Sequence, residues 1–185
     1  ILYSNGGGSA VNVDTLEFKP DLIWVKARNA TADHGLYDSV RGENNRLVSN
    51  LTNGESSVTG PVPANSGFSI AGTSYYNPSG SAGAATFVAW SWKAGGGKSG
   101  GGGFFKDGVE YSSRSDILSG GIASQIGAAS INTEAGFSII SFGGTAGSAD
   151  LPHGLGRVPG WILIKKYSAG GNSWAVYHQS NGCLL

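Results

Sequence analysis

The sequence predicts an all-β protein built as an antiparallel β-sandwich of the jelly-roll type. The chain has 32 glycines in 185 residues, more than twice the usual share of about 7%. Aromatic residues nevertheless make up 10% of the chain, which a disordered glycine-rich chain would not contain. Short apolar stretches recur at intervals of roughly ten residues, each bounded by Gly, Asn, Asp or Pro, and none has a sustained helical period. Regularly spaced short strands of this kind are typical of sandwiches.

An internal repeat defines how the chain is divided into units. The sequence starts inside one copy of the repeat and stops inside the next. Residues 1–26 align without a gap on residues 140–165, and after one extra loop residue the match continues with Tyr37 on Tyr177. A repeat of this length is a domain rather than one turn of a solenoid. We therefore expect one nearly complete unit that lacks its start, followed by part of a second, as a window cut from a longer polypeptide.

The division of the chain follows from that register. The first sandwich should occupy residues 1–94, a glycine-rich linker and connector residues 95–130, and the partial second repeat residues 131–185. We expect strands at residues 22–26, 36–38, 46–50, 67–70 and 86–92 in the first unit, and at 136–142, 161–165 and 174–177 in the second. Alternate residues of the strand 86–92 should face opposite sides of a sheet. Most of the five tryptophans should lie in the core.

Charge and hydropathy exclude several classes of partner. Twelve basic residues balance twelve acidic ones, so the chain offers no field for nucleic acid or an acidic membrane surface. No apolar run approaches the roughly 20 residues that span a bilayer. The single cysteine, Cys183, cannot form an internal disulfide. We expect neither nucleic acid nor membrane insertion.

The glycine-rich segment 95–103 contains Gly-Lys-Ser, which invites comparison with a phosphate-binding loop. That motif requires a glycine five places before Gly97, where this sequence has Trp92, and no helical run follows. The segment is therefore interpreted as a flexible linker.

No pattern of catalytic or metal-binding residues is present. Glycosidases on similar sandwiches need two carboxylates that face one bond, and no such spacing occurs. His34, His153 and His178 lie in different segments, and none forms a short His or Cys pair with metal-ligand spacing. We expect no enzyme activity, no metal and no cofactor.

Two local motifs are candidates for ligand or interface contacts. Asp38 and Arg41 could bind a sugar hydroxyl or a carboxylate, but an Asp and an Arg three residues apart more often close a turn, and we favour that interpretation. Tyr75 and Tyr76 stand next to each other in a Pro- and Gly-containing loop and cannot both face one core. Either could be a core edge or a contact for sugar or protein.

Several segments together resemble the repeating units of tail-fibre and related virion proteins of marine phages, especially cyanophages. These segments are residues 18–28, 36–42, 67–70, 77 and 87–93 of the first unit, and residues 105–111, 127–130, 136–140, 153–159 and 174–178 further on. The resemblance covers nearly the whole chain. It implies a concanavalin-like or laminin-G-like jelly roll located on the virion, commonly as a homotrimer, and it supplies no catalytic residues.

The function expected from the sequence is that of a virion structural protein, a phage tail-fibre or appendage module involved in attachment to the host surface. Its expected partners are other virion subunits and a host-surface glycan. Two alternatives stay open: a capsid decoration or fibre protein, and a carbohydrate-binding module of a secreted enzyme.

Overall fold

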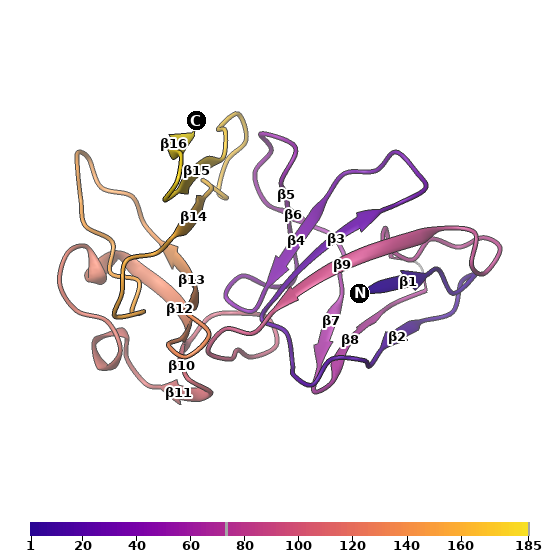
Figure 1. Cartoon of the computed structure of the whole chain (residues 1–185), viewed down its shortest axis with the longest axis horizontal. Coiled ribbons are helices and arrows are strands. Elements are labelled where there is room, and N and C mark those ends of the chain that lie inside the picture. Colours follow the sequence, from indigo (N-terminus) through magenta and orange to yellow (C-terminus); the bar gives the residue numbers. More distant parts are fainter. Residues whose placement is uncertain (73, 185) are drawn as a thin grey trace.

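Two antiparallel sheets pack face to face in the first half of the chain (Figure 1). The structure, a computed structural model, describes residues 1–72 and 74–184. The larger sheet has the strand order β1-β9-β3-β4-β5-β6 and the smaller one β2-β8-β7. The strands are β1 (Leu2–Ser4), β2 (Val11–Val13), β3 (Leu22–Ala27), β4 (Gly35–Asp38), β5 (Gly42–Val48), β6 (Ser56–Ser57), β7 (Val62–Ala64), β8 (Gly67–Ile70) and β9 (Thr86–Trp92).

The core of this sandwich follows from the alternation along each strand. Burial along β3 alternates strictly, so that Ile23, Val25 and Ala27 face the smaller sheet and are almost fully buried. Phe68 and Ile70 of β8 meet them from the other layer. A two-layer sandwich with one shared apolar core is the result.

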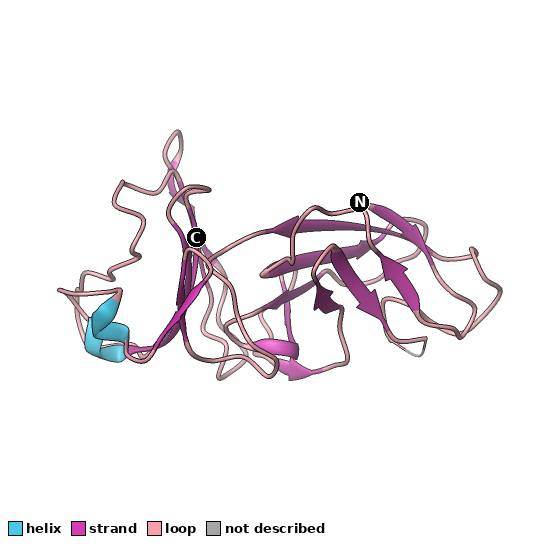
Figure 2. Cartoon of the chain, turned by 90° about the horizontal axis from the view of Figure 1, so that it is seen from below, coloured by secondary structure: helices cyan, strands magenta, loops and turns pink. Residues whose placement is uncertain are grey.

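The connector is a sheet in its own right. Its order is β11-β10-β12-β13, with β10 parallel to β12 and the other neighbours antiparallel. Its elements are β10 (Phe104–Lys106), β11 (Val109–Tyr111), the 3-10 turns η1 (Arg114–Asp116) and η2 (Ala123–Gln125), β12 (Ile126–Asn132) and β13 (Phe137–Phe142). Figure 2 shows the helical turns at the end of the molecule far from the first sandwich. A second apolar cluster around Ile126 and Ile131 stabilises this sheet, and the predicted boundary between residues 130 and 131 falls inside β12.

The second copy repeats the strand pairing of the first. Its sheet has the order β14 (Trp161–Ile164), β15 (Ala175–His178) and β16 (Gly182–Leu184). Leu22 lies opposite Asp38 in the first unit, and the aligned Trp161 lies opposite His178 in the second. The repeat seen in the sequence is therefore a repeat of the β3-β4-β5 meander.

The prediction of an all-β fold is confirmed, because strands cover 37% of the structure and helical turns only 3%. The strand pairs are antiparallel apart from β10 with β12. The jelly-roll connection of the strands stays a prediction. β8 and β9 have the expected bounds, whereas β5 runs from Gly42 to Val48 instead of 46–50. The tight turn that places Gly42 opposite Asp38 starts this strand earlier. The side chain of Cys183 lies outside the described residues.

The expectation that most tryptophans lie in the core is wrong. Trp90 and Trp161 are exposed and the other three are half-buried. The reason is the direction of the alternation: β9 turns Phe87 and Ala89 toward the core, so its tryptophans lie on the opposite face.

Candidate functional site

The outer face of the larger sheet carries a group of apolar side chains, two of them exposed and two half-buried. We call Leu2, Trp24, Val88 and Trp90 the aromatic face. The strand register places Leu2 opposite Val88 and Trp24 opposite Trp90, so the four residues come from the neighbouring strands β1, β9 and β3. Leu2 is 64% exposed and Trp90 is 44% exposed. Large apolar side chains gathered on one face mark a contact surface rather than a random surface.

The two indoles of the aromatic face are held in a defined arrangement. The rings of Trp24 and Trp90 lie 5.7 Å apart between centroids, at an interplanar angle of 57°. The indole N–H of Trp24 donates to Nδ1 of His34 over 3.1 Å, which fixes the Trp24 ring. Desolvation by burial, aided by the charge of Lys26, lowers the pKa of His34, which favours the neutral imidazole that this hydrogen bond requires.

The connector and the second copy contact the first sandwich near the aromatic face. The indole N–H of Trp174 donates to the backbone oxygen of Val48 in β5 over 3.1 Å. The ring of Phe137 from β13 stacks on Trp92 at 6.2 Å between centroids. The connector and the second copy thus cover one part of the outer side of the first sandwich and leave the aromatic face open.

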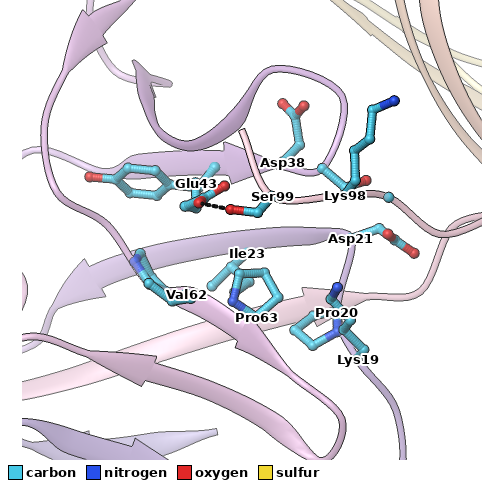
Figure 3. Close-up of a pocket in the computed structure, with 14 residues that line it drawn as sticks. Lys19, Pro20, Asp21, Ile23, Asp38, Glu43, Val62, Pro63, Lys98 and Ser99 are labelled. Atoms are coloured by element: carbon cyan, nitrogen blue, oxygen red, sulfur yellow. Dashed lines mark hydrogen bonds between the residues drawn. The ribbon is translucent and has the colours of Figure 1, made fainter. Parts of the chain in front are cut away.

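A small recess, lined mostly by apolar surface, lies between the two sheets of the first sandwich. In Figure 3, Glu43 and Ser99 lie on one side of it, and Ile23, Val62 and Pro63 on the other. Its volume is about 70 Å³. Pockets for drug-sized ligands occupy about 300–1,000 Å³, so this recess can hold a few waters or one small polar group.

The glycine-rich segment above this recess was expected to be a flexible linker, and the structure corrects that interpretation. Gly100 donates its backbone N–H to Glu43 over 2.9 Å, and the Ser99 hydroxyl donates to the same carboxylate over 2.7 Å. Further along, Gly102 donates to the backbone oxygen of Val40. The close approach depends on glycine, because a Cβ on Gly101, where φ is +81°, would lie 2.6 Å from the backbone carbon of Arg41. The segment is attached to the sandwich.

A second carboxylate, Asp21, fastens the start of this segment from within. Asp21 is only 3% exposed and accepts the backbone N–H groups of Ala94 and Gly96 over 2.8 and 3.3 Å. Desolvation raises its pKa despite these hydrogen bonds. At Glu43 the hydrogen bonds from Gly100 and Ser99 prevail and lower the pKa.

These opposite shifts predict opposite pH dependences for two variants. Asp21 binds its proton in the folded state before the unfolded chain does, so its share of the free energy of unfolding rises as pH falls from neutral toward its ordinary pKa of 3.8. The share of Glu43 is present above its ordinary pKa of 4.5 and is lost as pH falls through the lower folded value. On acidification across this range, urea unfolding should therefore show Asp21→Asn losing stability relative to wild type and Glu43→Gln gaining stability relative to wild type. Parallel curves would contradict both assignments.

The predicted contact pair Asp38 and Arg41 forms a nearly buried ion pair. Their side chains are 7% and 9% exposed, and a guanidinium nitrogen lies 2.6 Å from the Asp38 carboxylate. Asp38 also accepts the backbone N–H groups of Val40 and Arg41, while Arg41 donates to Glu55 and to the backbone oxygens of Leu36 and Asn45. The pair closes the turn between β4 and β5, the role that the sequence favoured.

The two adjacent tyrosines separate as expected. Tyr76 is fully buried and its ring meets the ring of Tyr37 edge to face at 6.0 Å. Tyr75 is 46% exposed and packs its ring under the guanidinium of Arg46, 5.1 Å from the centroid. Tyr76 is thus a core residue, and Tyr75 retains an exposed edge that a partner could contact.

A wider groove of about 840 Å³ lies between the connector and the second copy. His153 lies in it, with Nδ1 accepting the backbone N–H of Leu155. Within residues 1–72 and 74–184 there is no cluster of three or more His, Cys, Asp or Glu side chains able to hold a metal ion. The same part of the chain contains no helix with the length and hydropathy of a membrane span.

The aromatic face was not among the residues singled out from the sequence. A usable signal was present, since β9 alternates small residues at Ala89 and Ser91 with bulky ones at Val88, Trp90 and Trp92. In the structure the side of β9 with the small residues faces the core or its margin. The position of the smaller sheet decides which side of β9 is buried.

Comparison with known proteins gives one match. Searches of curated proteins and of solved structures found no significant similarity. A family described as a domain of unknown function, DUF7483, matches residues 1–183. That match takes in the first sandwich, the connector and the second copy, and the chain therefore belongs to the DUF7483 family.

Proposed function

We propose that the chain is a structural and adhesive module of a virion appendage, such as a phage tail fibre, and that its aromatic face is a contact with another subunit. The observation that carries this proposal is the open aromatic face, which adjoins the surface already covered by the connector and the second copy. Exposed tryptophans of this kind are typical of the centre of protein interfaces. The resemblance to marine phage fibre repeats supports the location on the virion, and a homotrimer is the expected assembly.

The geometry of the polar side chains supports a non-catalytic role. Asp38 and Arg41 close a turn, and Asp21 and Glu43 hold the glycine-rich segment. These groups already have partners within the chain, and the recess beside them is too small for a substrate with many atoms.

Sedimentation measurements on a single substitution test the proposed contact. The wild-type chain should sediment as an oligomer at micromolar concentration, and Trp90→Glu should weaken association by about 30-fold or more, as expected for a central tryptophan. The matched control is Val158→Glu, because Val158 is 85% exposed but lies outside the aromatic face. A monomeric wild type, or equal effects of the two substitutions, would contradict the proposal.

Antibodies against the chain would test the location separately. On purified phage particles, immunogold labelling of fibres supports the appendage, whereas labelling of the capsid alone supports a decoration protein. Particles without label would contradict a virion role.

Carbohydrate binding is the second candidate, favoured by the exposed rings of Trp90 and Tyr75. Sugars stack on such rings through their apolar faces. A glycan array would support this candidate if binding were lost in Trp90→Ala or Tyr75→Ala while the oligomeric state stayed unchanged.

A further inference from the structure

The loop between β5 and β6 holds an Asn–Gly pair at the surface of the first sandwich. Asn53 is exposed and Gly54 is half-buried. Within residues 1–72 and 74–184, neither the side-chain amide of Asn53 nor the backbone N–H of Gly54 has a hydrogen-bond partner. These are the two groups that react with each other when an asparagine converts to isoaspartate.

The conversion joins the backbone nitrogen of Gly54 to the side-chain carbonyl carbon of Asn53. As this C–N bond forms, the bond to the amide nitrogen breaks, and that nitrogen takes up the proton from Gly54 and leaves as ammonia. Water then opens the succinimide ring at either carbonyl, which gives aspartate or isoaspartate. Water is consumed and ammonia released, so the reaction balances without an oxidant or a reductant. Glycine favours the attack because it has no Cβ to hinder the approach and its backbone adopts many conformations.

The same dipeptide occurs at Asn5–Gly6, where the fold holds both groups. Asn5 is only 5% exposed, and its amide makes three hydrogen bonds to backbone groups between residues 78 and 85. The backbone N–H of Gly6 donates to Oδ1 of Asn77 over 2.8 Å. Reaction at this pair would require all of these hydrogen bonds to break first. The fold therefore blocks one Asn–Gly pair and leaves the other available.

The available pair lies where the second copy is attached to the first sandwich. On one side of it, the backbone oxygen of Thr52 accepts a hydrogen bond from Lys165 over 2.9 Å. On the other side, the backbone N–H of Glu55 donates to the backbone oxygen of Tyr167 over 2.7 Å. A Cβ on Gly54 itself would lie 2.9 Å from the same Tyr167 oxygen, so the two backbones are in close contact. The bond that would change is thus flanked by two anchors of the second copy.

We propose that Asn53 converts spontaneously to isoaspartate in the folded chain, and that the conversion weakens the contact between the first sandwich and the second copy. Isoaspartate routes the main chain through the former side chain, which adds one methylene before Gly54 and leaves a carboxylate on the loop. A closely packed contact does not absorb an added methylene without a shift, so one anchor is displaced relative to the other. This inference rests on the loop and holds whether or not the chain belongs to a virion.

Ageing the purified full chain at mildly alkaline pH tests the site. Fragmentation mass spectrometry should find conversion at Asn53 at least about tenfold faster than at Asn5, because Asn5 reacts only after local opening. Peptide mapping separates both from Asn181–Gly182, the third Asn–Gly pair of the chain. In urea, Asn53 and Asn5 should convert at similar rates, since the fold no longer distinguishes them.

Hydrogen exchange tests the consequence. The amide of Glu55, which is bonded to Tyr167 in the intact chain, should exchange faster after ageing. The matched variant Asn53→Gln, whose longer side chain closes the corresponding ring far more slowly, should age without this change. The proposal is overturned if Asn5 converts as fast as Asn53 in the folded chain, or if the difference between the two sites persists in urea. It is also overturned if Glu55 exchanges as slowly in chains that carry isoaspartate as in fresh ones.

Discussion

Replacing Asn77 with alanine should lower the free energy of unfolding by about 3 kcal/mol or more, because this fully buried amide connects three segments of the first sandwich. Its oxygen accepts the backbone N–H of Gly6 over 2.8 Å. Its nitrogen donates to the backbone oxygens of Ser9, Ile70 and Ala71 over 2.9 to 3.2 Å. Alanine would leave these backbone groups without their partner, and each such group costs about 1–3 kcal/mol when it stays buried. Urea unfolding followed by tryptophan fluorescence measures the loss.

Two further variants separate hydrogen bonding from packing at this position. Asn77→Asp keeps the shape and the acceptor for Gly6 but cannot donate to the carbonyl groups and adds a buried charge, so it should destabilise at least as much as alanine. The exposed Asn65 is the matched control, and Asn65→Ala should change the free energy of unfolding by less than about 0.5 kcal/mol. If Asn77→Asp were as stable as wild type, the hydrogen-bond explanation would be wrong.

Arg41→Ala should lower the free energy of unfolding by about 3–5 kcal/mol, since it leaves the carboxylate of Asp38 nearly buried and without its cation. The substitution also removes the donors to Glu55 and to the backbone of Leu36 and Asn45. Arg41→Lys should recover only part of this loss, because an ammonium group cannot reproduce the planar set of hydrogen bonds. The same urea titrations measure both effects.

This prediction also distinguishes the two roles considered for the pair. A ligand-binding arginine could be removed with little loss of stability, whereas an arginine that closes a turn could not. The exposed Arg28 is the control, and Arg28→Ala should change the free energy of unfolding by less than about 0.5 kcal/mol. If the Arg41→Ala chain were as stable as the Arg28→Ala control, the turn role would be wrong and Arg41 would again be a candidate surface contact.

Strands of strong alternation were predictable, and very short ones were not. β8 and β9 match their expected bounds because their own apolar pattern and turn residues define them. β6 and β7 contain only two and three residues, and β10 and β11, of three residues each, form a hairpin just after the glycine-rich segment. Such strands exist because a neighbouring strand is in place to pair with them, and a single sequence does not show which neighbour that is.

In the candidate site, contacts between residues near in sequence were predictable, and contacts between distant residues were not. The turn role of Asp38 and Arg41 followed from their spacing, because it depends on residues that are near one another in the chain. The aromatic face depends on Leu2, Trp24 and Trp90 coming from three strands that are far apart in the sequence. The attachment of the glycine-rich segment likewise depends on Asp21 and Glu43, whose partners lie more than fifty residues away.

The sequence by itself determined the all-β class and the repeat, because alternation and internal similarity can be read from the residues alone. Only the tertiary structure decided which face of each strand is covered. In β9 the core takes Phe87 and Ala89 and leaves the bulkier Trp90 44% exposed, since burial depends on the strands that pack around a residue and not on the residue alone.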